Sequence, residues 1–265
     1  MIARRKMTED DNLVRYRTPG VVSYYAEATQ LQPAERELFS KHLEPNISIL
    51  DIGVGGGRTT PYLAELAHHY VGIDYSEEMV RACRSRYPSQ RFELCDASDL
   101  TMFADETFDA VIFSFNGIDY LDPEGRSRCF SEVARVLADD GKFIFSSHNA
   151  RLLAVAPVLR GVSPIRGVVR LGRAGARTLQ SATRTIRAGA YGPAEGYVRD
   201  PVHGGLWTYT STPQTLEPQL SIAGLKMVDA LSAGMPAPKP TWLTPWFYYA
   251  CTRIPRHSRV SDPMP

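Results

Sequence analysis

The sequence has little cysteine, almost no net charge and no long apolar run, and each shortage excludes a class of protein. Its four cysteines in 265 residues have no CxxC spacing, so neither a disulfide framework nor a cysteine-based metal site is expected. The 30 basic and 29 acidic residues nearly cancel, which removes any global electrostatic reason to expect nucleic acid as a partner. No stretch approaches the roughly 18 apolar residues of a membrane span, and no apolar run follows the charged start of the chain. These absences favour a cytoplasmic protein with reduced cysteines and no signal peptide.

Apolar segments alternate with helical patterns along most of the chain, which predicts a parallel sheet with helices on both faces. At 265 residues the chain is long enough to bury about three quarters of its unfolded surface. The expected strands are 47–52, 70–73, 92–97, 108–113, 142–148, 225–231 and 246–253, with a further short strand or edge at 206–210. The expected helices are two in the first 45 residues, the second opening at Pro33, and then 59–67, 76–86, 123–138 and 212–223.

The chain is organised around residues 49–60, which begin as an apolar strand, turn through glycines and continue as a helical pattern. Gly53 and Gly55 allow the backbone to approach a ligand closely, which is typical of a nucleotide-type site. A dinucleotide fingerprint needs another glycine three residues after the second, and Arg58 stands there instead. Asp51, two residues ahead of the first glycine, would repel a pyrophosphate and suits a cationic or ammonium-bearing ligand.

This stretch and the segments after it resemble the class I S-adenosylmethionine (SAM) dependent methyltransferases. The second strand ends in Asp74, and residues 92–97 are similar to the family's third strand with its adenine-contacting aspartate, Asp96. Residues 108–117 resemble the fourth strand and the start of the catalytic loop, and residues 132–148 resemble the following helix, turn and fifth strand. The resemblance implies a Rossmann-like class I methyltransferase fold, with a seven-stranded mostly parallel sheet, helices on both faces, an N-terminal helical lid and a cap insertion.

We therefore expect a single domain over residues 1–265 with four parts. These parts are a helical lid (1–45), a SAM-binding core (46–149), an arginine-rich cap insertion (150–205) and the C-terminal helix with the last strands (206–265).

The resemblance also implies which residues contact SAM. Asp51, Gly53 and Gly55 would hold the methionine portion, and Asp74 would bind the ribose hydroxyls. The predicted contacts are completed by the adenine-binding Asp96 and Ala97, the apolar wall of Tyr75 and Met79, the lid residues Tyr16 and Tyr25, and Ser114. For Met79 and the lid tyrosines, packing onto the core is the alternative interpretation, and for Asp74 it is a helix cap.

Methyl transfer from a sulfonium needs alignment of the acceptor and, for some acceptors, removal of a proton. His148, at the end of the fifth strand, is the preferred general base because its ordinary pKa suits that task. Asn116 on the loop after the fourth strand is a further catalytic candidate, and His203 in the insertion is the second candidate base. The alternative is that His148 only shapes the pocket.

Two departures limit what the resemblance carries over. The fourth strand lacks the Asp/Asn-Pro-Pro-Tyr/Phe signature of enzymes that methylate exocyclic amines of nucleic acid bases. The sequence also has no cluster of Cys, His or acidic residues of the kind that metal-dependent methylation needs, so no metal is expected.

Residues 151–200 form the least ordinary part of the sequence, with nine arginines, no lysine and two acids, a formal charge of nine minus two, or +7. An arginine-lined cap would favour a carboxylate or phosphate acceptor through bidentate hydrogen bonds. The alternatives are a solvated basic helix face and a basic amphipathic helix that contacts a membrane surface.

The function predicted from these features is methyl transfer from SAM to oxygen or nitrogen of a small molecule, with carbon as the weaker option, leaving S-adenosylhomocysteine. The sequence leaves two rival functions open, a SAM-binding protein without transferase activity and an NAD-dependent oxidoreductase. It says nothing of the acceptor's identity or of oligomeric state.

Overall fold

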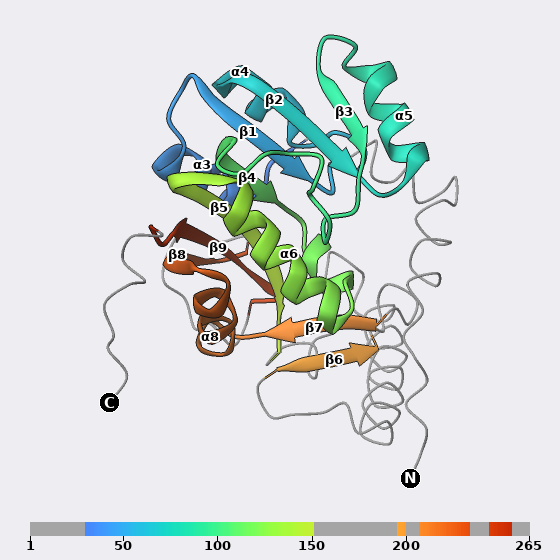
Figure 1. Cartoon of the computed structure of the whole chain (residues 1–265). Coiled ribbons are helices and arrows are strands. Elements are labelled where there is room, and N and C mark those ends of the chain that lie inside the picture. The colour runs from blue at the N-terminus through green and yellow to red at the C-terminus, as the bar shows by residue number, and fades with distance from the viewer. Residues whose placement is uncertain (1–29, 151–194, 200–206, 234–243, 256–265) are drawn as a thin grey trace.

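The computed structural model describes residues 30–150, 195–199, 207–233 and 244–255, which form one mixed sheet with helices on both faces (Figure 1). The strands of this sheet are β1 (Ile47–Ile52), β2 (Ala67–Asp74), β3 (Arg91–Leu94), β4 (Phe108–Phe113), β5 (Leu137–Asn149), β6 (Gly196–Arg199), β7 (Trp207–Ser211), β8 (Leu225–Ser232) and β9 (Trp246–Arg253). The helices are α3 (Pro33–His42), α4 (Thr60–Leu66), α5 (Glu77–Arg86), the short 3₁₀ helix η1 (Gly117–Tyr120), α6 (Pro123–Val136) and α8 (Pro213–Ala223).

The centre of the sheet is parallel and has the neighbour order β3-β2-β1-β4-β5. Antiparallel β9 pairs with β5 on the far side from β4, and β8 pairs with β9 in turn. These are the seven strands that the sequence predicts, and the Rossmann-like class I methyltransferase fold is confirmed. The carboxyl ends of β1, β2, β3 and β4 therefore meet at one edge, where ligands of such sheets bind.

The sheet is larger than predicted, since the described residues contribute nine strands to it. β5 is 13 residues long and runs past the end of β4, whose Phe113 pairs with Phe145. The part of β5 that extends beyond β4 pairs with β7 through His148 and Asn149, and β6 pairs antiparallel with β7. β6 lies inside the stretch assigned to the cap insertion, and its four residues are too few to give a strand periodicity.

Helix boundaries follow local capping signals in the sequence. The Ser76 hydroxyl accepts a hydrogen bond from the Met79 N–H at the start of α5, and Thr212 caps α8 in the same way through Thr215. Gly224 ends α8 with a φ of 85°, a left-handed conformation in which glycine has no steric cost. Each of these helices accordingly begins and ends within a residue or so of the predicted position.

The core has one apolar cluster on each face of the sheet. On the face with α6 and α8, Phe130 and Leu216 pack with Phe143 and Phe145 of β5. On the other face, Leu38 and Phe39 of α3 pack with residues of α4, α5 and β9. Burying a side chain of this size stabilises the fold by roughly 1.5–3 kcal/mol each, so α3 is fixed against the sheet at its apolar face.

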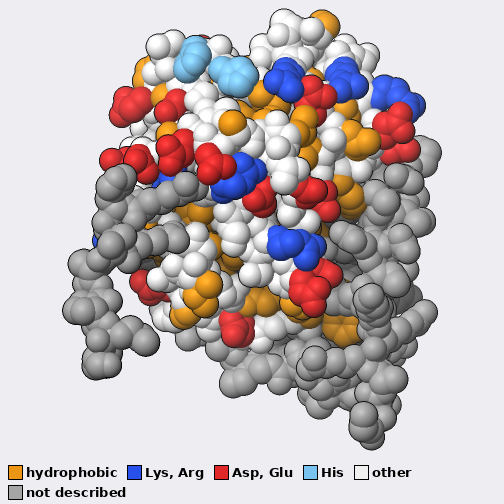
Figure 2. All heavy atoms as spheres, in the orientation of Figure 1, with side chains coloured by type: hydrophobic (Ala, Val, Ile, Leu, Met, Phe, Trp, Pro, Cys, Tyr) orange, Lys and Arg blue, Asp and Glu red, His pale blue; other side chains and the backbone are white. Residues whose placement is uncertain are grey.

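Figure 2 shows the face that carries α6 and α8, where acidic and basic side chains are intermingled. Among the described side chains in this view, neither sign forms a continuous patch, so this face gives no argument for a polyanionic partner. None of the helices within the described ranges is long and apolar enough to cross a membrane.

Candidate active site

A pocket lies at the carboxyl edge of the parallel strands and is lined by residues from segments 51–59, 74–79, 95–97 and 113–121. Every predicted cofactor residue of the described chain lines it, namely Asp51, Gly53, Gly55, Asp74, Tyr75, Met79, Asp96, Ala97 and Ser114. Their roles toward a ligand stay predictions. Tyr16 and Tyr25 lie outside the described residues, as do His203 and most of the segments assigned to the lid and cap.

The glycine loop after β1 needs its glycines for steric reasons that the structure makes explicit. Gly53, Gly55 and Gly57 have φ values of 62°, 53° and 82°, in the left-handed region. A Cβ on Gly53 would also lie 2.8 Å from Cε2 of Phe113, which is too close for any real contact. The loop therefore runs tightly beneath the pocket, with backbone rather than side chains facing it.

Asp51 is 1% exposed at the end of β1, and its Oδ2 accepts hydrogen bonds from the Thr59 hydroxyl (2.6 Å) and the Tyr70 hydroxyl (2.9 Å). Both bonds end on the same oxygen, so among the described residues Oδ1 has no hydrogen-bond donor and keeps its lone pairs. Burial raises the pKa of Asp51 to about 6, against the lowering effect of the two hydroxyls and of the Arg58 charge. The carboxylate is thus ionised at neutral pH at a considerable cost.

Asp74 ends β2 and fixes the glycine loop from the opposite side. Its two oxygens accept hydrogen bonds from the backbone N–H groups of Gly55 and Ser76, each at 2.9 Å. Burial raises the pKa of this carboxyl to about 6 as well, although these backbone donors lower it. The backbone N–H of Tyr75 is a third donor to this carboxylate, which has about four acceptor positions in all, so room is left for a hydrogen bond from a ligand hydroxyl.

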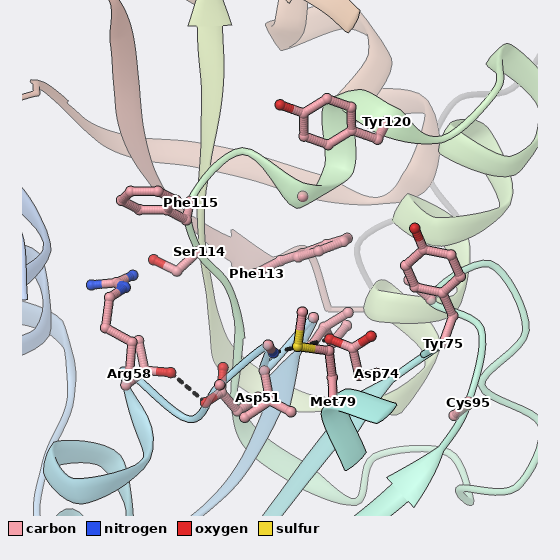
Figure 3. Close-up of a pocket in the computed structure, with 18 of the residues that line it drawn as sticks. Asp51, Arg58, Asp74, Tyr75, Met79, Cys95, Phe113, Ser114, Phe115 and Tyr120 are labelled. Carbon is pink, nitrogen blue, oxygen red and sulfur yellow. Dashed lines mark hydrogen bonds between the residues drawn. The ribbon is translucent and has the colours of Figure 1, made fainter. Parts of the chain in front are cut away.

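The pocket is elongated, with chemically different ends (Figure 3). Tyr75 and Cys95 lie on one side of the view, Arg58, Ser114 and Phe115 on the other, and Asp51, Asp74 and Met79 between them. At the Tyr75 end, Asp96 accepts a hydrogen bond from the Ser98 N–H at 2.7 Å. Met79 is only 2% exposed, so it serves the core as well as the pocket wall, and the packing alternative for it stands beside the predicted contact.

At the other end of the pocket, Arg58 forms a buried bidentate ion pair with Glu35 of α3, with both N···O distances 2.6 Å. The hydroxyl of Ser114 donates to the same carboxylate, which is completely buried. In the sequence, Arg58 stands out only as a departure from a dinucleotide fingerprint, and Glu35 does not stand out at all. The one local signal was an acid in the first turn of a predicted helix, which ordinarily is just a capping residue.

The loop after β4 is held in an unusual backbone conformation. Phe115 and Asn116 have φ values of 58° and 63°, and a bulky residue such as Phe is an outlier there. The Asn116 N–H donates to the Ser146 hydroxyl at 2.7 Å, while its own side-chain oxygen is buried and has no partner within the described residues. Strain of about 1–3 kcal/mol per residue persists in proteins where surrounding contacts impose it, and such sites are frequently functional.

His148 is buried in β5 and oriented by Asp119 of η1. Oδ2 of Asp119 lies 2.8 Å from His148 Nδ1 and accepts the His148 backbone N–H at 2.7 Å. Because a carboxylate accepts at Nδ1, that nitrogen carries the proton in the neutral ring and Nε2 is the basic atom. Nε2 lies 3.4 Å from the side-chain nitrogen of Asn116, so the structure brings these two predicted catalytic residues together.

His148 is not among the residues that line the pocket, which is a difference from its expected place beside the transfer site. The ring of Tyr120, which does line the pocket, stands edge-on to the imidazole at a centroid distance of 6.3 Å. Trp246 contacts the imidazole from another side at the same distance. The ring of Tyr120 therefore lies between the predicted base, His148, and the pocket.

Asp119 is completely buried and has hydrogen-bond partners that no sequence pattern indicates. Its Oδ1 accepts hydrogen bonds from Arg126 Nη1 (3.1 Å) and the Ser147 hydroxyl (2.7 Å). The guanidinium of Arg126 stacks 4.1 Å from the ring centroid of Tyr209. Arg126 lies four residues before Phe130, on the buried face of α6, but arginine is ordinarily exposed, and only the fold shows which groups it pairs with.

Within the described ranges no group of three or more His, Cys, Asp or Glu side chains is arranged to hold a metal ion. The four cysteines are all free thiols. Burial raises the pKa of Cys95 beside the pocket to about 11, so this thiol is protonated at neutral pH and is a poor nucleophile.

Known proteins of similar sequence include methyltransferases. A family model described as a methyltransferase domain matches residues 49–141. The putative methyltransferase YqeM of Bacillus subtilis is 30% identical over 143 residues, which is 51% of this chain and 57% of that protein. A demethylmenaquinone methyltransferase of Clavibacter sepedonicus is 34% identical over 99 residues, 36% of this chain and 39% of that protein. The match thus spans 57% of the length of the first relative and 39% of the second.

Solved structures extend the likeness to the fold of almost the whole chain. A 1,6-didemethyltoxoflavin-N1-methyltransferase of Burkholderia thailandensis, solved with its toxoflavin precursor and S-adenosylhomocysteine, has a TM-score of 0.61 at 16% identity and covers 96% of this chain and 92% of that one. The CcbJ methyltransferase of Streptomyces caelestis has a TM-score of 0.60 at 16% identity, covering 89% and 96%. At such identities the likeness concerns the fold alone.

Proposed function

We propose that the chain, which belongs to the class I SAM-dependent methyltransferase family, transfers a methyl group from SAM to an oxygen or nitrogen of a small molecule, with carbon as the weaker option. The observation that carries the proposal is the single pocket that joins the glycine loop, Asp74, the Asp96–Ala97 turn and the loop after β4. These are the places at which this chain resembles the family in sequence, and they converge on one cavity.

The proposed cofactor pose follows from the chemistry of the two pocket ends. Asp74, whose carboxylate accepts backbone N–H groups and keeps acceptor capacity beyond them, would accept a ribose hydroxyl at the centre. Asp96 and the Ala97 N–H would bind the adenine, with Tyr75 and Met79 against the purine ring. Asp51, Gly53, Gly55 and Ser114 would surround the methionine portion, and Tyr16 and Tyr25 stay as predicted lid contacts.

When bound, SAM supplies a methyl group that its sulfonium already activates, so the protein must chiefly align the acceptor and manage a proton. His148 is the proposed base, because Asp119 fixes its proton on Nδ1 and leaves Nε2 basic. Asn116, whose side-chain nitrogen lies 3.4 Å from Nε2, is proposed to help orient the imidazole. A positioned base of this kind typically contributes about 10²- to 10⁴-fold in rate. His203 stays the second candidate.

The acceptor is proposed to be a small molecule, anionic or of the natural-product kind, in a cytoplasmic setting and without nucleic acid. The arginines between residues 151 and 200 support an anionic acceptor, since guanidinium groups bind carboxylate or phosphate bidentately. The structural neighbour that was solved with 1,6-didemethyltoxoflavin bound supports the small-molecule class.

Two experiments in sequence test the proposal. Calorimetric titration with SAM, S-adenosylhomocysteine and NAD identifies the cofactor, and labelled SAM is then incubated with carboxylate, phosphate, phenol and amine acceptors. Tight SAM binding followed by label transfer supports the proposal. Binding of SAM that no acceptor can turn over favours the non-catalytic SAM-binding alternative. Displacement of SAM by NAD would favour the oxidoreductase.

A further inference from the structure

Glu35 has a carboxylate that is saturated with hydrogen bonds although its side chain is completely buried. Oε1 accepts from Arg58 Nη2 and from the Ser114 hydroxyl, and Oε2 accepts from Arg58 Nη1 and from the Gln32 N–H at 2.6 Å. A carboxylate has about four acceptor positions, so Glu35 has nothing left for a ligand. It acts as an anchor that caps α3 and fixes Arg58 at once.

Arg58, by contrast, is not saturated. Of its five N–H groups, both on Nη1 are used by Glu35 and the Gln30 carbonyl, and one on Nη2 is used by Glu35. The remaining two, on Nε and Nη2, lie side by side on one edge of the planar guanidinium, and neither has a partner within the described part of the chain. This open edge has the spacing that binds a carboxylate bidentately.

The contacts around Arg58 preset the direction of that edge. Glu35 holds the end of the guanidinium, and the ring of Phe115 covers its face at 4.8 Å from the centroid. The side chain is 10% exposed and lines the pocket, at the end where Ser114 and Phe115 also lie (Figure 3). A long, flexible side chain is thus already ordered before any ligand arrives, which reduces the entropy cost of binding.

The charges at this end of the pocket are complementary to an amino acid. Asp51 presents an ionised Oδ1 without a protein partner in the described residues, and Arg58 presents the open cationic edge. An α-ammonium suits the first group and an α-carboxylate suits the second. Without the cation, a ligand carboxylate here would face the two carboxylates of Asp51 and Glu35 and would be repelled.

We infer that Arg58, ordered by Glu35, binds the α-carboxylate of the methionine portion of SAM and makes the pocket selective for cofactors that retain this carboxylate. The inference deepens the proposed function and rests on it. Arg58 is then a cofactor-binding residue, and Glu35 is a positioning residue that never touches the ligand. The adenosine end of the ligand, near Tyr75, is independent of both.

A thermodynamic cycle tests the inference by removing the arginine and the carboxylate separately and together. The affinities of SAM, decarboxylated SAM and 5′-methylthioadenosine are measured by calorimetry for the wild type and for Arg58→Gln. The wild type should bind SAM about 10- to 100-fold more tightly than decarboxylated SAM, the range expected for a charged bidentate contact. In Arg58→Gln this preference should fall to within about threefold, while 5′-methylthioadenosine binds unchanged.

Controls separate recognition from folding. Arg81→Gln removes an arginine whose side chain is 71% exposed and whose ion pair with Glu77 lies on the surface of α5, and it should keep the full preference. Should Arg58→Gln fail to fold with Glu35 left unpaired, the double variant Arg58→Gln with Glu35→Gln removes both charges and is measured in the same cycle.

The outcomes are distinct. An equal loss of affinity for all three ligands, or a preference for SAM that survives in the variants, overturns the inference and leaves the proposed function standing. Failure of the wild type to bind SAM overturns the proposed function, and the inference with it.

Discussion

Replacing Asp51 by asparagine should stabilise the unliganded protein at neutral pH while it weakens cofactor binding. The carboxyl is 1% exposed and its hydrogen bonds come from two neutral hydroxyls, so burial raises its pKa from 3.8 to about 6. A shift of about two units corresponds to roughly 3 kcal/mol that the ionised group costs the folded state. An asparagine keeps the shape, and its oxygen can accept the same hydroxyls of Thr59 and Tyr70. We expect a gain of about 1–3 kcal/mol in the free energy of unfolding at pH 7.

The pH dependence of this gain follows from the sign of the shift. Because the folded-state pKa is raised, the contribution of Asp51 to stability is fully present below about pH 3.8 and is lost as the pH rises through about 6. The advantage of Asp51→Asn should therefore fall to about half by pH 5, where the wild-type carboxyl is largely protonated in the folded state. Urea unfolding at pH 7 and pH 5, followed by circular dichroism, measures both values.

Asp74→Asn is the matched control, because burial raises the pKa of Asp74 to about 6 as well. Its oxygens accept backbone N–H groups of Gly55, Ser76 and Tyr75, and an amide would turn its own N–H₂ toward at least one of these donors. This variant should therefore gain nothing, and the unmade bond should cost about 1–3 kcal/mol. A destabilised Asp51→Asn, or an equal gain at both pH values, would refute the reasoning from buried charge.

Three further predictions concern ligand binding and turnover. Lowering the pH through about 6 should weaken SAM binding, because protonation of Asp51 and Asp74 removes negative charge from the pocket. A calorimetric affinity that stays constant from pH 8 to 5 would contradict this. His148→Ala should leave SAM affinity unchanged and lower kcat about 10²-fold or more, and Asp119→Asn should alter the pH–rate profile. Full turnover in His148→Ala would show that His148 has only a structural role. Gly53→Ala should destabilise the protein by about 1–3 kcal/mol in thermal unfolding and impair SAM binding. The φ of residue 53 is 62°, and the added Cβ would meet the Phe113 ring. Unchanged stability and SAM affinity would show that the loop can relax.

Local signals explain why much of the fold could be predicted from the sequence. The cap residues Ser76, Thr212 and Gly224 act within one helical turn, so they identify helix ends without knowledge of the fold. The gathering of Asp51, Asp74 and Asp96 around one pocket was also predictable. Carboxyl ends of neighbouring parallel strands necessarily meet at one edge of a sheet.

Contacts between distant residues explain what could not be predicted. Glu35 and Ser114 are 79 positions apart and meet only because α3 packs beside the end of β4. The spacing of α6 puts Arg126 on the buried face, but nothing near it in the sequence identifies Asp119 and Tyr209 as its partners. β7 lies where a short strand or edge was expected at 206–210, but its pairing with β6 and with the end of β5 depends on β5 running past β4, a length that no local pattern sets.

The distribution of charge partners argues for what the pocket accepts. Glu35 and Asp119, which do not line the pocket, are each paired with a buried arginine, so their charges are neutralised within the protein. Asp51 and Asp74, which do line it, are bonded in the described residues only by hydroxyl and backbone N–H donors, and their pKa values rise to about 6. Among the buried acids of the described residues, the two that line the pocket are therefore the ones without an arginine or lysine partner. We expect their charge to be completed by a cationic ligand, which a sulfonium bearing an ammonium group satisfies and a pyrophosphate does not.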